Sequence, residues 1–277
     1  MGFKYASVLT IAGSDCSGGA GIQADLKTFA ALGCYGTSAI TAVTVQNTLG
    51  VQKLHKLPTE LVLDQIMAVM EDIQCAAIKI GMVHSRSLTE AIARTLKKYT
   101  VPVIFDPVMV ASSGDLLLEA DAIDTLKKVL FPLCTLVTPN LDEASVLTSI
   151  EIRSLKDMEN AAKRLIEEGC QAVLIKGGHL KGTELFDLYL DQQGKQHIFS
   201  SKWINTENTH GTGCTLSSAI AVHMARGFDL LTAIEKARLY VHNAIENGKD
   251  VKTGKGHGPL NHSFDPEKMI LYAVDNK

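Results

Sequence analysis

Short apolar runs rich in Val and Ile alternate with amphipathic segments along most of the chain. Such runs predict buried strands. The candidate strands are residues 7–11, 37–45, 76–80, 101–106, 135–138 and 172–175. Their starts recur roughly every 25 to 40 residues, the length of a strand followed by a crossover helix. The pattern therefore predicts a mostly parallel sheet.

The segments between the strands carry apolar residues at helical spacing. Residues 59–73 and 155–168 each place an apolar stripe on one face, and two more helices are expected at 213–226 and 230–246. Helices that follow parallel strands cover both faces of a sheet. The predicted fold class is α/β, a three-layer α/β/α sandwich.

The alternation of strand and helix patterns ends after Gly178. Residues 185–190 and 196–200 flank the turn sequence DQQGK, which predicts an antiparallel hairpin on the sheet edge. The later loop NGKDVKTGKGHGPLNH is typical either of a ligand-binding loop or of a surface turn. There is no internal repeat and no Pro/Ser-rich linker, so residues 1–277 are expected to form a single domain.

Composition agrees with a sheet buried on both faces. Apolar residues make up 46% of the chain and aromatic residues only 5%, so Ala, Val, Leu and Ile must build the core. Lys and Arg number 27 against 30 Asp and Glu, a net charge of −3. That balance argues against nucleic-acid and membrane partners.

The cell compartment is predicted from the N-terminus and the cysteines. The first residues lack the apolar core of a signal peptide, and the uncharged stretch 28–52 is too rich in Thr and amides for a membrane span. The six cysteines are at least 18 residues apart and form no CxxC pair, which argues against zinc and disulfides. A soluble, cytoplasmic protein is expected.

Polar residues follow several predicted strands. In a parallel sheet, ligands bind beyond the carboxyl ends of the strands. The residues at these positions include an amide, two carboxylates, an Asn and a Lys: Gln46, Asp106, Glu143, Asn140 and Lys176. Any one of them could simply cap a helix, but the set together favours a site.

A glycine-rich loop, AGSDCSGGAG, follows the first strand. It lacks the Lys-Ser/Thr of a P-loop and the GxGxxG spacing of a dinucleotide fold, so both interpretations fail. Asp25 lies in the helix that follows. It either stabilises the helix N-terminus by its charge or accepts hydrogen bonds from a flat substrate admitted by the glycines.

A second glycine motif, His210 to Cys214, precedes an apolar helix. Backbone N–H groups of Gly211, Thr212 and Gly213 would converge at the positive end of the helix dipole, an arrangement that binds a phosphoryl group. The same field would lower the pKa of the Cys214 thiol and favour a thiolate at neutral pH. The alternative is a small residue packed at a helix start.

Taken in order, the motifs resemble those of a known family. They are TIAGSDCSGGAGIQADLKTFAALGCYG, ITAVTVQNT, KIGM, DPVM, TPNLDEA, KGGH, NTHGTGCTLSSAI and GHGP. The chain resembles the ribokinase-like superfamily and, within it, the hydroxymethylpyrimidine and phosphomethylpyrimidine kinases of thiamine biosynthesis. The resemblance implies a ribokinase-like fold without a separate lid domain, and ATP-dependent phosphorylation of 4-amino-5-hydroxymethyl-2-methylpyrimidine (HMP) to its phosphate and then its diphosphate.

The resemblance also implies the substrate-binding residues. Gln46 would read the aminopyrimidine with its amide, and Asp25 would bind a second polar edge of the ring. Gly13 would offer a backbone contact, and Met82 and Val108 would form apolar walls.

For catalysis, the resemblance implies an anion hole at Gly211, Thr212 and Gly213, and a catalytic position at Cys214. Lys176 would neutralise nucleotide phosphate charge. Asn140 and Glu143 would organise Mg²⁺, with Asp106 either on the magnesium side or a buried structural residue. His210 and residues 255–259 are expected near the nucleotide.

Further expectations concern closure and assembly. ATP and Mg²⁺ are the implied co-substrate and cofactor, and a homodimer is implied by the resemblance alone. Without a lid, loops around 111–116 and 251–259 would exclude water.

Three rival functions remain open. A pyridoxal or pyridoxine kinase of the same fold is the nearest, and Gln46 with the complete N-terminal block favours the pyrimidine. A sugar or nucleoside kinase is disfavoured because no β lid is inserted after the first loop. A non-catalytic nucleotide sensor is disfavoured by the presence of Lys176, Asn140, Glu143 and the GTGC motif.

Overall fold

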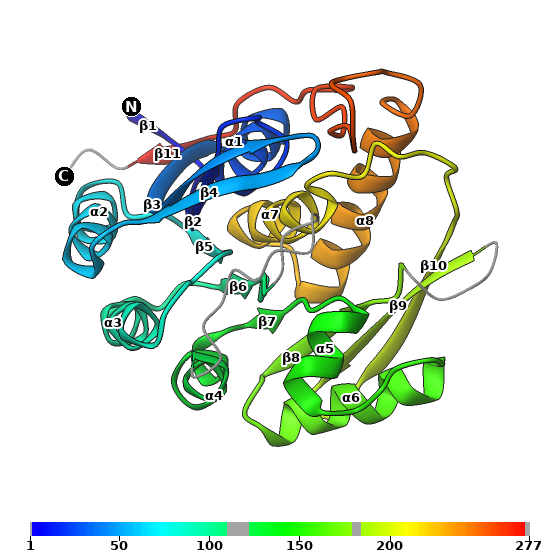
Figure 1. Ribbon diagram of the computed structural model, residues 1–277. Coiled ribbons are helices and arrows are strands. Elements are labelled where there is room, and N and C mark those ends of the chain that lie inside the picture. Colours follow the sequence, from blue (N-terminus) through cyan, green and yellow to red (C-terminus); the bar gives the residue numbers. More distant parts are fainter. Residues whose placement is uncertain (1, 110–121, 179–183, 275–277) are drawn as a thin grey trace.

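A computed structural model describes residues 2–109, 122–178 and 184–274. Its centre is a nine-stranded sheet in the order β10-β9-β8-β7-β6-β5-β2-β3-β4 (Figure 1). Six strands run parallel: β2 (Ser7–Asp15), β3 (Tyr35–Asn47), β5 (Ala77–Ile80), β6 (Val103–Phe105), β7 (Leu136–Val137) and β8 (Ala172–Lys176). The predicted parallel sheet is confirmed.

Antiparallel strands close both edges of the sheet. On one edge, β9 (Glu184–Asp191) and β10 (Gln196–Lys202) form the predicted hairpin. On the other edge, β4 (Gly50–Lys56) pairs with β3. A separate two-stranded ribbon joins β1 (Gly2–Tyr5) to β11 (Leu271–Val274). The sequence pattern did not predict β1, β4 or β11.

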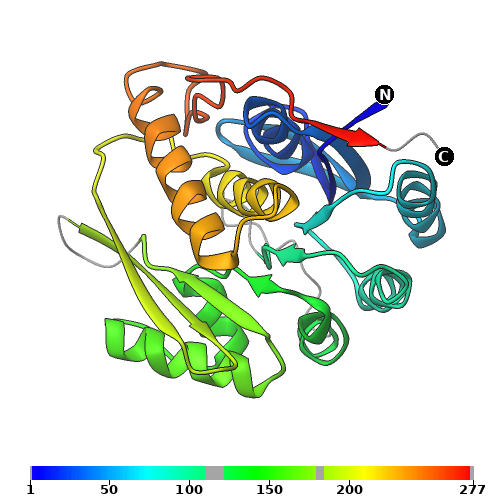
Figure 2. The ribbon, with the colours of Figure 1, turned by 180° about the vertical axis from the view of Figure 1, so that it is seen from behind.

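Helices cover both faces of the sheet, as Figures 1 and 2 show from opposite sides. One face packs against α2 (Thr59–Asp72), α3 (Arg86–Leu96), α5 (Leu141–Thr148) and α6 (Leu155–Glu167), with α4 (Ala122–Thr125), η1 (Leu126–Leu130) and η2 (Phe131–Leu133). The other face packs against α1 (Gly21–Ala31), α7 (Thr212–Ala225) and α8 (Leu230–Glu246). The three-layer prediction is confirmed.

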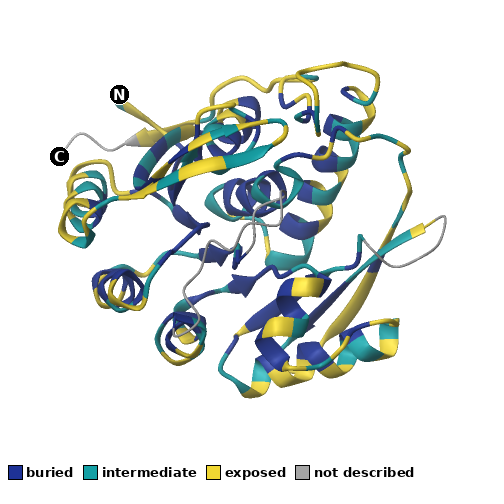
Figure 3. Ribbon diagram, in the orientation of Figure 1, coloured by how far each residue is buried: buried dark blue, intermediate teal, exposed yellow. Residues whose placement is uncertain are grey.

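Strand side chains alternate between the two cores, as the period of a strand requires. On β5, Ile78 and Ile80 enter the core of α2 and α3, whereas Ala77 faces α1 and α7. Figure 3 shows that β5 to β8 and α7 are mostly buried, while the β3–β4 hairpin is largely exposed. Within the described residues, no helix is both long and apolar enough to cross a bilayer.

Candidate active site

Several polar residues, among them predicted site residues, lie at the edge of the sheet where the parallel strands end. Asp15 and Gln46 lie at the ends of β2 and β3, and Lys176 ends β8. The helix α7 packs against β2, β5 and β6 in the middle of the sheet (Figure 1). The topology therefore brings together residues that are far apart in the sequence.

The two glycine loops interlock. Gly211 has φ of +85°, and a Cβ on it would lie 1.9 Å from the Gly19 carbonyl oxygen. A Cβ on Gly19 would lie 2.2 Å from Cδ2 of His210. Only glycine allows the backbones to approach this closely.

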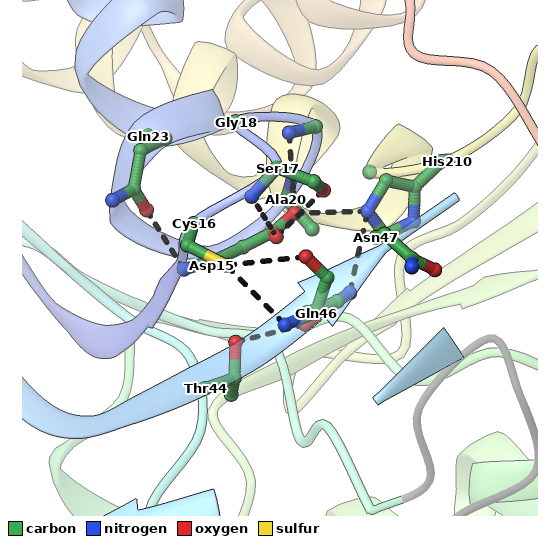
Figure 4. Close-up of polar contacts among 12 residues, drawn as sticks. Asp15, Cys16, Ser17, Gly18, Ala20, Gln23, Thr44, Gln46, Asn47 and His210 are labelled. Carbon is green, nitrogen blue, oxygen red and sulfur yellow. Dashed lines mark hydrogen bonds and ion pairs between the residues drawn. The ribbon is translucent and has the colours of Figure 1, made fainter. Parts of the chain in front are cut away.

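Asp15 holds the first loop in shape (Figure 4). Its carboxylate accepts hydrogen bonds from the backbone N–H groups of Ser17 (2.8 Å), Gly19 (3.1 Å) and Ala20 (2.8 Å), and from Nε2 of His210 at 2.9 Å. Burial opposes the charge, but the bonds from His210 and Ser17 outweigh it and hold the pKa of Asp15 well below its usual range. The sequence analysis did not identify Asp15.

Gln46 extends from the end of β3 over this loop. Its amide lies between Thr44 Oγ1, at 3.1 Å, and His210 Nε2, at 3.4 Å (Figure 4). The Cys16 thiol donates to the Gln46 carbonyl oxygen at 3.1 Å, which ties the strand to the loop. The amide is thus held at the rim of the glycine loop.

Gly13 and Met82 are in contact below this rim. A Cβ on Gly13 would lie 2.5 Å from Cε of Met82, which is only 6% exposed. Val108 is half-buried and follows β6 at the same edge of the sheet. Met82 thus lies beside Gly13, and the roles of Met82 and Val108 as apolar walls stay a prediction.

Asp25 lies beneath the site and not on its surface. It is 0% exposed, and its oxygens accept from Lys79 Nζ (2.9 and 2.8 Å), Thr10 Oγ1 (2.6 Å) and Ser218 Oγ (2.7 Å). These four contacts occupy the carboxylate. The predicted hydrogen bond from the substrate to Asp25 does not fit this geometry.

The sequence analysis missed Lys79, the partner of Asp25. Lys79 is also 0% exposed, and a Cβ on Gly81 would lie 2.9 Å from its Nζ. Burial alone would lower the pKa of Lys79, but the adjacent Asp25 raises it. A lysine within the apolar run AIKIG could have signalled a buried ion pair, because such a charge requires a partner.

Lys176 meets the predicted carboxylates beside α7. Its Nζ lies 2.7 Å from Asp106 Oδ1 and 3.9 Å from Glu143 Oε2. A Cβ on Gly213 would lie 3.2 Å from Nζ of Lys176 and 3.3 Å from Asp106 Oδ2. The structure thus brings Lys176 and Asp106 to the start of the GTGC helix.

Asn140 and Glu143 form a capping box at the start of α5. The Asn140 side chain accepts from the Glu143 N–H, and Glu143 accepts from the Asn140 N–H, both at 2.8 Å. Burial raises the pKa of Glu143 to about 7, although Lys176 pulls in the opposite direction. Glu143 therefore caps α5 and also lies close to Lys176.

Cys214 lies in the first turn of α7 and is partly buried. Burial raises the pKa of its thiol to about 11, and the charge of Lys79 offsets only part of this rise. The prediction of a lowered pKa is therefore wrong for the free site, because desolvation exceeds the favourable charges. Cys214 is a neutral thiol at neutral pH.

The surroundings of His210 differ from the prediction. Its side chain is 6% exposed and bonds to Asp15 beside Gln46, so the expected nucleotide contact does not fit. Its backbone N–H donates to the Gly258 carbonyl, while the backbone N–H groups of Lys255 and Gly256 donate to Thr48 Oγ1. The loop 251–259 therefore packs on the site. The loop 111–116 lies outside the described residues.

A metal would have few protein ligands here. Within the described ranges, no three His, Cys, Asp or Glu side chains form a cluster that could hold a metal ion. Asp106 and Glu143 supply the hard oxygen ligands that Mg²⁺ prefers, and Mg²⁺ commonly takes only one or two protein carboxylates beside substrate phosphates. The residues present fit such a site.

Two solved kinases share this fold. Pyridoxal kinase from Staphylococcus aureus, in complex with AMP-PCP and pyridoxal, matches with a TM-score of 0.85 and 33% identity, over 94% of this chain and 94% of that chain. Phosphomethylpyrimidine kinase from Clostridium difficile 630 matches with a TM-score of 0.76 and 43% identity, over 86% of this chain and 99% of that chain. The fold, shared with these kinases at 33% and 43% identity, places the protein in the ribokinase-like class of kinases.

The family follows from the sequence comparison. The profile of the phosphomethylpyrimidine kinase family matches residues 15–261. The hydroxymethylpyrimidine/phosphomethylpyrimidine kinase of Rhizobium meliloti (strain 1021) is 47% identical over 258 residues, which cover 93% of this chain and 97% of the relative. The chain belongs to the phosphomethylpyrimidine kinase family.

Proposed function

We propose that the protein transfers the γ-phosphoryl group of ATP to the hydroxymethyl oxygen of HMP, and then a second phosphoryl group to the resulting monophosphate, in thiamine biosynthesis. The observation that carries this proposal is the shared sheet edge. There Gln46, able to read an aminopyrimidine, lies against the loop of His210, directly before the anion-binding residues Gly211 to Gly213.

In phosphoryl transfer the protein itself does little covalent chemistry. The transition state is loose and rich in charge, so positioning and electrostatic stabilisation supply most of the catalysis. The N–H groups at the start of α7 would bind the transferring group, and Lys176 would offset phosphate charge. Asp106 and Glu143 would hold Mg²⁺, which neutralises phosphate oxygens when bound.

Cys214 enters this scheme as a neutral thiol. The proton of the hydroxymethyl group leaves late in a loose transition state, so a strong base is not required. The thiol would orient the hydroxyl by hydrogen bonding. Only a Cys214 that has first released its own proton to solvent, as a thiolate favoured by Lys79 and opposed by Asp25 and Asp106, could accept the hydroxyl proton. Cys214 is therefore proposed to orient the substrate first and accept its proton second.

A pyridoxal kinase is the second candidate function. The match to the Staphylococcus aureus enzyme in complex with pyridoxal favours it, since that structure has the same fold over most of both chains. A coupled ATP assay with HMP and pyridoxal separates the two. We expect turnover of HMP and of its monophosphate, and turnover of pyridoxal alone would overturn the proposal.

A cytoplasmic homodimer is also proposed, from the family resemblance. The β3–β4 hairpin exposes Val43 and Val45 of β3, which are 42% and 49% exposed, next to β4, the last strand of the sheet. Such an edge is suited to association with a second copy. Light scattering during size-exclusion chromatography should give twice the mass of the 29.9 kDa chain.

A further inference from the structure

The side-chain amide of Gln46 has two different neighbours. Its Oε1 lies 3.1 Å from Thr44 Oγ1 and its Nε2 lies 3.4 Å from His210 Nε2, and Figure 4 shows both contacts. The two ends of an amide have nearly the same shape, so the hydrogens on the neighbours decide which end faces which. Those hydrogens can be assigned from the rest of the network.

At His210 the assignment follows from Asp15. The Asp15 carboxylate accepts from three backbone N–H groups and from the Ser17 hydroxyl, and its low pKa keeps it ionised. An ionised carboxylate can only accept, so Nε2 of His210 must carry a hydrogen to make its 2.9 Å bond. That hydrogen points to Asp15, so an amide nitrogen beside Nε2 would set two donors against each other. An amide oxygen in the same place faces the positive end of the N–H group and shares its hydrogen weakly.

At Thr44 the assignment follows from Ser14. The Thr44 hydroxyl has one hydrogen, and the Ser14 carbonyl oxygen, 2.9 Å away, can only accept it. The hydroxyl oxygen is then left to accept from Gln46, which requires the amide nitrogen on this side. Both neighbours therefore favour the same orientation.

We propose that Asp15, acting through His210, and Ser14, acting through Thr44, set the Gln46 amide with its oxygen toward His210 and its nitrogen toward Thr44. This orientation is a half-turn from the one drawn in Figure 4. The amide then fixes the direction in which the aminopyrimidine lies in the site. This inference rests on the function proposed above.

The order of the groups on the ring determines where the hydroxymethyl group lies once the amide orientation is set. In HMP the ring nitrogen N3, the 4-amino group and the 5-hydroxymethyl group follow one another around the ring. The amino group donates to the amide oxygen and N3 accepts from the amide nitrogen, which places the amino group on the His210 side. The hydroxymethyl group then lies beyond it, toward Gly211 to Cys214, where phosphoryl transfer is proposed. Asp15, His210 and Thr44 are thus positioning residues.

Thr44→Val tests the proposal, with Thr44→Ser as its matched control. Valine keeps the branched shape in β3 but removes the hydroxyl, whereas serine keeps the hydroxyl. The substrates are HMP and its 4-oxo analogue, whose C4=O accepts and whose N3–H donates, and which therefore needs the opposite amide. Thr44→Val should lower the kcat/KM ratio of HMP to the analogue about fivefold, the effect of one neutral hydrogen bond, mainly through KM. Thr44→Ser should keep the wild-type ratio, and an unchanged ratio in Thr44→Val would overturn the proposal.

A second measurement uses the unaltered protein and needs no activity. The ¹⁵N NMR spectrum of histidine-labelled protein, with His210 assigned through His210→Phe, should show a hydrogen on Nε2 of His210. A bare Nε2 would overturn the proposal even if HMP is the substrate. If the protein fails to phosphorylate HMP, the proposed function falls, while the NMR result still decides the orientation of Gln46.

Discussion

Lys79 and Asp25 carry opposite charges with no exposed surface, so removing either leaves the other charge buried without a partner. We expect Lys79→Met to lower the free energy of unfolding by about 3–5 kcal/mol. Lys79→Met combined with Asp25→Asn should recover part of the loss. Urea unfolding measures both variants.

The control is an exposed ion pair. Lys156 pairs with Glu159 on α6 but is 69% exposed, so Lys156→Ala should change the stability by less than about 1 kcal/mol. A loss of similar size in Lys79→Met would show that the buried pair contributes no more than a surface pair.

Cys214 should react slowly with alkylating reagents. With a pKa of about 11, only roughly one thiol in ten thousand is ionised at pH 7. Its alkylation rate, followed by mass spectrometry of the Cys214 peptide, should rise about tenfold per pH unit up to pH 10 without a plateau. A rate that stops rising near pH 7 would contradict the raised pKa and support the thiolate expected from the helix dipole.

Cys214→Ala should affect the two phosphorylations unequally. The first acceptor is a neutral hydroxyl, whereas the second is a phosphate oxygen that is already ionised near neutral pH. We expect a larger fall in kcat with HMP than with its monophosphate, each assayed separately. Equal losses would contradict a role for Cys214 in handling the hydroxyl proton.

The sequence predicted several residues of the site, but not the direction in which each side chain points. Lys176 and Asp106 were predicted from their places after parallel strands, and the structure brings them together. The sequence could not show that Asp25 points into the protein, because its partner Lys79 is 54 residues away. The pairing of Asp15 with His210 spans 195 residues and has no local signal.

At the scale of elements, the contact between the two glycine loops is the feature most open to a direct test. Gly211→Ala would force the loops apart, since its Cβ would lie 1.9 Å from the Gly19 carbonyl oxygen. A displacement of about 1 Å at a phosphoryl site can lower the rate on the order of 100-fold. We expect such a loss in the ATP-coupled assay.

Gly194 provides the matched control for this prediction. It lies in the β9–β10 turn with φ of +80°, and a Cβ there would have no atom within 4 Å. Gly194→Ala therefore incurs the strain of positive φ, about 1–2 kcal/mol, without the clash. It should lose stability but keep activity, and equal activity in both alanine variants would refute the argument.

The elements that followed a strong periodicity were predicted well. The helix predicted at 230–246 has the same bounds as α8, and the one at 59–73 differs from α2 by one residue. The strand β4 was missed because GVQKLHK carries Lys53, His55 and Lys56 and lacks an apolar run. Its pairing with β3 comes from the sheet edge and not from its own composition.

At the scale of the whole molecule, the ionisation of Glu143 predicts a dependence of stability on pH. The folded protein raises its pKa from 4.5 to about 7, so ionisation disfavours the folded state. The contribution of this group to stability is complete below about pH 4.5 and is lost as the pH rises through 7. Glu143→Gln should therefore gain stability relative to wild type over this window.

Denaturant unfolding at pH 4.5, 6 and 8 checks this difference. Glutamine can keep the capping box with Asn140, so the variant isolates the charge from the cap. The stability difference between the two proteins should grow with pH. A difference that stays constant from pH 4.5 to 8 would contradict the raised pKa.

The contact of Gly19 with Gly211 also has a consequence during synthesis. The two residues are separated by most of the chain, and the backbone of His210 further pairs with Pro259 near the C-terminus. The ribosome must therefore release the chain at least as far as Pro259 before the two parts of the site can meet. A shorter nascent chain carries Asp15, Gln46 and the first glycine loop without His210 and Gly211, so the site can become complete only after the segment up to Pro259 has been made.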